Sequence, residues 1–187
     1  MKRVAFIDRD GTLNVEKNYV HRIEDFEWIP GSLAALQALS QSHILIYVIT
    51  NQAGIARGLY TEEDLKLLNQ HILEIMQKAQ VKIQDILYCP HHPQGSVEQY
   101  SITCDCRKPG NALIRKALHQ EGLSAKQAVL IGDKNTDIEA GQSLGIPSYL
   151  VLTGYGLQEK ETTTADFIAK DLKEAVQHFL CPSKPSF

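Results

Sequence analysis

The sequence predicts an α/β fold in which helices cover both faces of a doubly wound, mostly parallel sheet. Short apolar runs of strand length alternate along the chain with longer segments in which apolar residues recur at helical spacing. The apolar runs are nearly continuous, as is typical of strands that are buried on both faces. Strands and helices that alternate in this way build one sheet with crossover helices.

Five runs rich in Val, Ile, Leu and Tyr are expected to form the strands. In chain order they are Val4–Ile7, Ile44–Ile49, Ile86–Tyr88, Ala128–Ile131 and Ser148–Leu152. One helix should begin at Thr61, because Thr61 and Asp64 form a pattern close to a capping box and apolar residues then recur on one face. The other predicted helices are Ser32–Gln41, Ala112–Glu121, Thr136–Leu144 and Leu172–Leu180.

Size and composition indicate a globular protein. With 187 residues, of which 43% are hydrophobic and 22% charged, the chain is expected to form one domain over residues 1–180, followed by a flexible tail at 181–187. The net charge of −3 and the lack of a basic run argue against a nucleic-acid partner. Neither a run of roughly 18 apolar residues nor a signal-peptide stretch is visible. We therefore expect a cytoplasmic monomer that does not bind membranes.

Two carboxylates, Asp8 and Asp10, follow the first predicted strand with one residue between them. This pattern suits phosphoryl chemistry, because one carboxylate can attack phosphorus, the next can handle a proton, and both can share Mg²⁺. A plain Asp-Gly turn that closes a strand is the alternative interpretation. A calcium loop fits poorly, because its sixth and twelfth positions, which require Gly and Glu, would be Leu13 and Tyr19.

A second metal site is predicted in the loop 89–106, which is rich in Pro, Gly and Ser. Two short donor pairs, Cys-x-His and Cys-x-Cys, lie at its ends, and three thiolates with one imidazole form a closed tetrahedral zinc site. Such a site is structural, because a catalytic zinc keeps one position open. The predicted ligands are Cys89, His91, Cys104 and Cys106. His91 is favoured because it repeats the spacing of the second pair, and His92 remains the alternative; Cys181 is expected to be incidental.

Further polar groups follow other predicted strands. Thr50 comes after the second strand, Lys108 precedes a helix, and Asp133 follows another strand. Because the carboxyl ends of parallel strands meet at one edge of a sheet, these groups should converge with Asp8. Together the four motifs resemble the haloacid dehalogenase superfamily of aspartate-nucleophile phosphatases. The resemblance implies a Rossmann-like core. Because the insertions between the predicted elements are short, we expect only the small zinc-binding loop and no separate cap domain.

The zinc loop resembles that of one particular family within this superfamily. Cys-Pro-His-His-Pro-x-Gly, about a dozen residues, and then Cys-Asp-Cys-Arg-Lys-Pro is similar to the loop of the D-glycero-D-manno-heptose 1,7-bisphosphate 7-phosphatases, as are residues 14–21 and 50–58. Histidinol-phosphate phosphatases, which have a shorter loop, are the alternative. The closer resemblance implies removal of the C7 phosphate to give heptose 1-phosphate, in the synthesis of nucleotide-activated heptose, with either anomer compatible.

Each catalytic role has a candidate in this reading. Asp8 is expected to form an aspartyl phosphate, and Asp10 to act as general acid and then general base. Lys108, Arg107 and Thr50 should stabilise charge on the transferred phosphoryl group. The resemblance implies that Mg²⁺ is held by Asp8, Asp133 and the main-chain carbonyl of Asp10. Asp137 is expected to cap the next helix rather than to bind metal.

A phosphorylated sugar is the expected partner, and the resemblance places its contacts at the rim of the site. Lys134, and with less support Arg57, are candidates for the distal phosphate, with a plain surface charge as the alternative for each. A non-catalytic sugar-binding module is disfavoured because no catalytic group is missing. The full predicted substrate-binding set is Glu16, Lys17, Asn18, Tyr19, Thr50, Asn51, Gln52, Ala53, Arg57, Arg107, Lys108 and Lys134.

Overall fold

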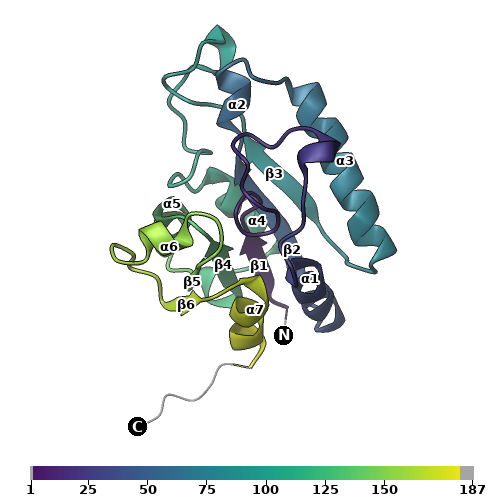
Figure 1. Ribbon diagram of the computed structural model, residues 1–187. Helices are drawn as coiled ribbons and strands as arrows, with labels where there is room; N and C mark the ends of the chain where they lie inside the picture. The colour runs from purple at the N-terminus through teal and green to yellow at the C-terminus, as the bar shows by residue number, and fades with distance from the viewer. Residues whose placement is uncertain (1, 182–187) are drawn as a thin grey trace.

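The fold is a single six-stranded, wholly parallel sheet with helices on both faces, seen in a computed structural model that describes residues 2–181 (Figure 1). The strand order is β3-β2-β1-β4-β5-β6. The strands are β1 (Val4–Ile7), β2 (Leu45–Asn51), β3 (Asp85–Cys89), β4 (Ala128–Gly132), β5 (Ser148–Val151) and β6 (Phe167–Ala169). The predicted α/β class is confirmed. Apart from Cys181, the expected tail lies outside the described residues.

The helices agree with the predicted alternation, and two short ones add to it. The helices are α1 (Ser32–Gln41), α2 (Ala53–Ala56), α3 (Glu62–Lys78), α4 (Ala112–Glu121), α5 (Asn135–Gln142), α6 (Gly156–Glu159) and α7 (Leu172–Leu180). Short 3₁₀ turns are η1 (Ile23–Asp25), η2 (Glu98–Tyr100) and η3 (Ala125–Gln127). The N-terminus of α3 is the expected capping box, in which Thr61 and Asp64 each accept from the other's backbone N–H.

Both faces of the sheet are buried, which explains the nearly continuous apolar strands. Successive side chains of β1 point to opposite faces. Ala5 and Ile7 pack in the core beneath α1, α3 and α7. Val4 and Phe6 pack in the core beneath α4 and α5. The central strand is thus covered on both sides, and its polar side chains begin only where it ends, at Asp8.

The structure corrects three details of the predicted elements. The second strand runs to Asn51 rather than Ile49, because Thr50 and Asn51 continue the ladder with Tyr88 and Cys89 of β3. β6 was not predicted, because Phe-Ile-Ala is too short to show a strand period. α2 and α6 were missed for the same reason, since each has only four residues.

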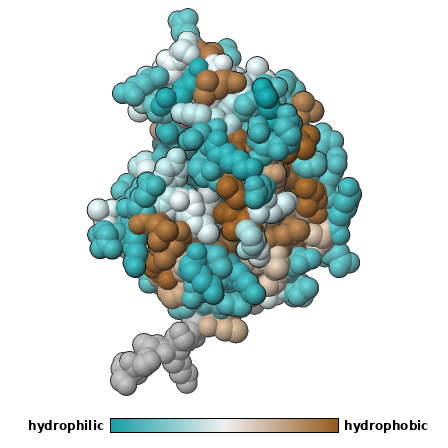
Figure 2. Space-filling view, viewed as in Figure 1, coloured by the Kyte–Doolittle hydropathy of each residue, from teal (hydrophilic) through white to brown (hydrophobic). Residues whose placement is uncertain are grey.

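The loop between β3 and α4 contains η2 as its only helical turn and lies against α2 in Figure 1, where Ser96 and Val97 donate to the carbonyl of Ala56. No separate cap domain is present in residues 2–181, as predicted. Figure 2 shows hydrophilic side chains over much of the visible face, with apolar side chains in smaller groups between them. Among the helices of the described residues, none combines the length and apolar character needed to cross a membrane.

Candidate active site and metal sites

A pocket of about 300 Å³ opens at the carboxyl ends of the central strands. Doubly wound sheets bind ligands at this edge, where the chain crosses from one side of the sheet to the other. The structure brings together in the pocket wall most residues that the sequence singled out. These are Asp8, Asp10, Glu16, Asn18, Tyr19, Thr50, Asn51, Gln52, Ala53, Arg57, Arg107, Lys108 and Lys134.

Asp8 and Lys108 form a buried ion pair at the base of the pocket. Lys108 Nζ lies 2.6 Å from Asp8 Oδ1, and it also contacts Asp137 Oδ1 at 2.5 Å and the carbonyl of Ile49 at 2.6 Å. All three donors of the ammonium group are therefore used. Asp8 is held in turn by its own backbone N–H, which donates to Ile131 of β4.

Asn51 fixes the backbone of Lys108. Its side-chain Nδ2 donates to the Lys108 carbonyl, and its Oδ1 accepts from the Lys108 N–H, both at 3.0 Å. Asn51 is the last residue of β2 and pairs with Cys89 in the sheet ladder. The last residue of β2 thus holds the backbone of Lys108 and pairs with Cys89, the first residue of the zinc loop.

Asp133 lies behind the pocket wall, directly after β4, and is fully buried. Its Oδ2 accepts from the Tyr155 N–H at 2.8 Å, whereas its Oδ1 has no hydrogen-bond partner in residues 2–181. Gly11, at φ +87°, and Gly154, at φ +55°, press their backbones against this carboxylate. A Cβ at either position would overlap Asp133, so only glycine fits there.

The carboxylates Asp8, Asp133 and Asp137 form a cluster whose ligand oxygens lie within 4.8 Å of one another. Burial raises the pKa of Asp8 to about 6, with Lys108 opposing the shift and Asp137 adding to it. Burial, followed by the charge of Asp8, raises the pKa of Asp133 to about 8. Burial lowers the pKa of Lys108, but Asp137 and Asp8 outweigh it and raise the value. The cluster holds more negative charge than one lysine offsets, and it includes Asp133, whose buried Oδ1 has no hydrogen-bond partner in residues 2–181. These residues therefore fit Mg²⁺, which prefers carboxylate and carbonyl oxygens.

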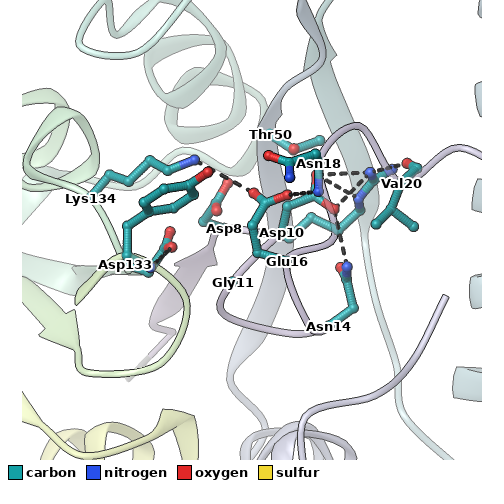
Figure 3. A network of polar contacts seen from close by, with 12 residues as sticks. Asp8, Asp10, Gly11, Asn14, Glu16, Asn18, Val20, Thr50, Asp133 and Lys134 are labelled. Carbon is teal, nitrogen blue, oxygen red and sulfur yellow. Dashed lines mark hydrogen bonds and ion pairs between the residues drawn. The ribbon is translucent and has the colours of Figure 1, made fainter. Parts of the chain in front are cut away.

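Asp10 is held on the other side of the pocket by several donors, as Figure 3 shows. Arg9 donates from Nε at 3.1 Å and from Nη2 at 2.8 Å to Asp10 Oδ2, and Asn14 Nδ2 donates to Oδ1 at 3.1 Å. Arg9 is itself fully buried and also donates to the carbonyl of Val20 at 2.7 Å. The Asp10 side chain keeps 15% exposure and lines the pocket.

The rim carries positive charge opposite the strand ends. Lys134 Nζ lies 4.3 Å from the centre of the Tyr155 ring and 3.7 Å from Glu16, the latter contact drawn in Figure 3. Arg57 lies over the ring of Tyr19 at 5.9 Å. Burial lowers the pKa of Lys134, but the charge of Asp133 and its neighbours outweighs burial and raises it, so the ammonium stays charged.

Lys17 lies apart from the other residues of the predicted substrate-binding set. Its Nζ pairs with Glu27 at 2.8 Å, and it is not among the residues that line the pocket in the described chain. The next two residues, Asn18 and Tyr19, have φ near +60° and turn the chain so that they face the pocket while Lys17 faces away. In this structure Lys17 forms a surface ion pair outside the pocket lining, and its predicted substrate contact stays a prediction.

The predicted zinc ligands converge at the end of β3. The three sulfur–sulfur distances among Cys89, Cys104 and Cys106 are 3.0, 3.2 and 3.5 Å. His91 Nδ1 lies 3.4 Å from Cys106 Sγ and 3.8 Å from Cys89 Sγ. Two thiolates on one tetrahedral zinc with ~2.3 Å bonds would lie about 3.8 Å apart, somewhat farther than these sulfurs lie, so a small outward shift of this donor set would give a closed zinc site. His91 lies in this cluster with the three thiols, whereas His92 lines the pocket.

Several residues of the site were not predicted. Arg9 sits between two motif aspartates, so its position was visible, but its burial and its contact with Val20 depend on the fold. Tyr60 and Tyr155 carry no motif, and only the pocket reveals them. Asp137 caps the backbone N–H of Lys134, as predicted, but it also pairs with Lys108.

Comparisons with known proteins agree with this geometry. A family model described as HAD-hydrolase-like matches residues 105–175. A D-glycero-alpha-D-manno-heptose-1,7-bisphosphate 7-phosphatase of Photorhabdus laumondii is 44% identical over 84% of this chain and 86% of its own. A D-glycero-beta-D-manno-heptose-1,7-bisphosphate 7-phosphatase of Escherichia coli K12 is 36% identical over 97% and 95%.

A solved structure gives the same result for the fold. The D,D-heptose 1,7-bisphosphate phosphatase of B. bronchiseptica, complexed with magnesium and phosphate, superposes with a TM-score of 0.87 at 26% identity, covering 98% of this chain and 100% of its own. The match thus extends over the sheet, the loop that carries the zinc ligands and the pocket. The chain belongs to the heptose 1,7-bisphosphate 7-phosphatase family of the haloacid dehalogenase (HAD) superfamily.

Proposed function

We propose that this protein removes the C7 phosphate of D-glycero-D-manno-heptose 1,7-bisphosphate to give heptose 1-phosphate, with Mg²⁺ as its catalytic cofactor. The observation that carries the proposal is the buried Asp8, which meets Lys108 and the Asp133 carboxylate at the base of a pocket in a chain of this family. The names of the relatives indicate the substrate, and the side chains of the pocket indicate the type of reaction.

In the first half-reaction, a carboxylate oxygen of Asp8 attacks phosphorus in line with the C7 oxygen. The bond between phosphorus and that oxygen breaks, and Asp10 gives a proton to the departing oxygen, which becomes the C7 hydroxyl of the sugar. The product is an aspartyl phosphate on Asp8. Lys108 keeps Asp8 oriented, because the ion pair fixes Oδ1 at 2.6 Å.

In the second half-reaction, Asp10 takes a proton from a water molecule whose oxygen attacks phosphorus. The bond between phosphorus and Asp8 breaks, which frees inorganic phosphate and restores the carboxylate. The donors around Asp10, from Arg9 and Asn14, keep its carboxylate in one place through both proton transfers.

Charge on the transferred phosphoryl group is balanced by groups at the base of the pocket. We infer that Asp8, Asp133 and the main-chain carbonyl of Asp10 hold Mg²⁺, which when bound offsets negative charge on the phosphoryl oxygens. Lys108 and Arg107 add fixed positive charge, and the Thr50 hydroxyl donates a hydrogen bond. The zinc site is structural and holds the loop that leads into Arg107 and Lys108.

The rim is proposed to bind the sugar and its second phosphate. Lys134 and Arg57 offer charge-assisted contacts to the C1 phosphate while the C7 phosphate occupies the base of the pocket. Glu16, Asn18 and Tyr19 are placed to contact sugar hydroxyls, and Gln52 and Ala53 complete the same wall. We further infer a cytoplasmic monomer that acts on this small substrate in the supply of nucleotide-activated heptose for lipopolysaccharide.

Phosphorus NMR of the reaction mixture tests this proposal directly. Both anomers of heptose 1,7-bisphosphate should lose the C7 phosphate while the C1 phosphate signal remains. Histidinol phosphate and fructose 1,6-bisphosphate serve as comparison substrates and should react more slowly. Loss of the C1 phosphate first, or a clear preference for histidinol phosphate, would overturn the proposed substrate.

A further inference from the structure

Gln52 connects the two sides of the pocket. Its side chain is only 2% exposed, and its Nε2 donates to Asp10 Oδ2 and to Thr50 Oγ1, both at 2.9 Å. Its Oε1 accepts from the Tyr60 hydroxyl at 2.5 Å and, more weakly, from Arg9 Nη2 at 3.4 Å. Every hydrogen-bonding position of the amide is therefore used inside the protein, and Gln52 acts on other protein groups rather than on substrate.

The direction of the amide matters for the chemistry. In this orientation, one N–H meets the Asp10 carboxylate and the other meets the Thr50 oxygen, so the Thr50 hydroxyl hydrogen stays available for a phosphoryl oxygen. A flipped amide would place its carbonyl against the Asp10 carboxylate and would leave two acceptors facing each other. The group that sets the direction of Gln52 therefore also sets the geometry of Asp10 and Thr50.

The group that sets the direction of the Gln52 amide is Tyr60, whose position is fixed by its surroundings. Its side chain is 6% exposed, and its ring stacks on His21 with 4.7 Å between ring centres and 7° between planes. The ring also packs with Ile55 and Leu65, and a Cβ at Gly54 would overlap it. Burial raises the pKa of the Tyr60 hydroxyl, so it stays protonated and acts as a donor. The donor position is thus fixed from several sides before any substrate binds.

We propose that Tyr60 is a positioning residue for catalysis, whose hydroxyl orients the Gln52 amide and through it holds Asp10 and Thr50. The inference rests on the proposed function, because it assigns Asp10 and Thr50 their roles in phosphoryl transfer. It extends that function to a pocket residue that carries no motif and whose hydroxyl donates to Gln52 rather than to Asp10 or Thr50.

The test is Tyr60→Phe, which keeps the ring and removes only the donor. We expect kcat to fall about tenfold, part of the 10²–10⁴-fold that a general acid and base supplies, while KM changes less than about twofold. The melting temperature should stay within a few degrees of the wild type. A raised KM with unchanged kcat would show direct substrate contact and would overturn the proposal.

Tyr88→Phe is the matched control. Tyr88 packs against the same small core and donates from its hydroxyl to Glu62 Oε1 at 3.0 Å, away from the pocket wall. Loss of this hydroxyl should leave kcat unchanged. An equal fall in kcat for both variants would mean that the Tyr60 hydroxyl matters only for packing and would count against the proposal.

A double-mutant cycle with Gln52→Met then locates the effect. If Tyr60 acts through Gln52, Tyr60→Phe should cause no further loss of kcat in the Gln52→Met background. Independent, multiplicative losses would overturn the relay. All variants are assayed with heptose bisphosphate and with p-nitrophenyl phosphate. A wild type that hydrolyses only p-nitrophenyl phosphate contradicts the proposed substrate, and the cycle on that ester still decides the role of Tyr60.

Discussion

The two aspartates of the pocket, Asp8 and Asp10, are surrounded by different sets of side chains. Asp8 meets a buried lysine and other carboxylates, whereas Asp10 meets an arginine, an asparagine and a glutamine. Two identical residue types, separated by one position, thus occupy different electrostatic surroundings. The difference suits one carboxylate to attack phosphorus and the other to exchange protons.

Asp8→Asn should abolish turnover, with phosphate release at least about 10³-fold slower, because the amide is a poor nucleophile of nearly equal volume. Circular dichroism should show an intact fold. Asp85→Asn is the matched control, because Asp85 opens β3 and its Oδ1 accepts from the N–H of Ile86, which an amide oxygen also does. Near-normal Mg²⁺-dependent phosphate release by Asp8→Asn would exclude the covalent mechanism.

The sequence was sufficient to predict where residues that follow a strand lie in the fold. Asp8 and Asp10 follow one apolar run and Asp133 follows another, so the edge at which they meet could be predicted from the strand pattern alone. Tyr60 and Gln52 could not be paired in this way, because their contact depends on the turn made by α2. The direction of the Lys17 side chain could not be predicted either, because it depends on two following residues with positive φ that no pattern predicts.

Among the segments of the fold, β2 and the zinc loop are the two whose contact joins the pocket wall to the cysteine and histidine cluster. The ladder between β2 and β3 ends with Asn51 opposite Cys89, so the zinc cluster begins where the pocket wall begins. The predicted strand stopped at Ile49 because Thr50 and Asn51 are polar, and only cross-strand pairing keeps them in the sheet. Zinc bound by this cluster would supply the order that a loop with one 3₁₀ turn lacks.

Cys104→Ser should lower the zinc content from one per chain to near zero and make the loop 89–106 more sensitive to limited proteolysis, because a structural site needs all four donors. Elemental analysis of protein purified without chelator measures the metal. Cys181→Ser is the control, since Cys181 is exposed and lies outside the cluster, and it should retain zinc. Wild-type protein without zinc would contradict the site.

The cluster of buried carboxylates lies at the middle of the sheet, where its two halves meet. β1 and β4 are neighbours at the centre of the sheet, and Asp8 and Asp133 lie just beyond their carboxyl ends. In the metal-free protein, carboxylates with raised pKa values face one another across this junction. A cation bound there joins two segments that are far apart in sequence, so metal binding should be visible in global stability.

Mg²⁺ should therefore raise the melting temperature. At about 100 times its Kd, a ligand that binds only the folded state adds about 2.7 kcal/mol. For a chain of this size, that corresponds to about 5–10 °C in calorimetry. Asp133→Asn should lose the Mg²⁺ dependence while it keeps its zinc. A Mg²⁺-dependent rise of equal size in this variant would place the cation elsewhere.

The two hydrogen bonds from Asn51 to the backbone of Lys108 also bear on inhibition. Lys108 follows Cys106 by two residues, so the lysine is held by β2 on one side and by the zinc cluster on the other. A thiol-reactive compound that ejects zinc would displace the lysine without occupying the sugar site. Such an inhibitor would lower the maximal rate and would not be displaced by saturating substrate.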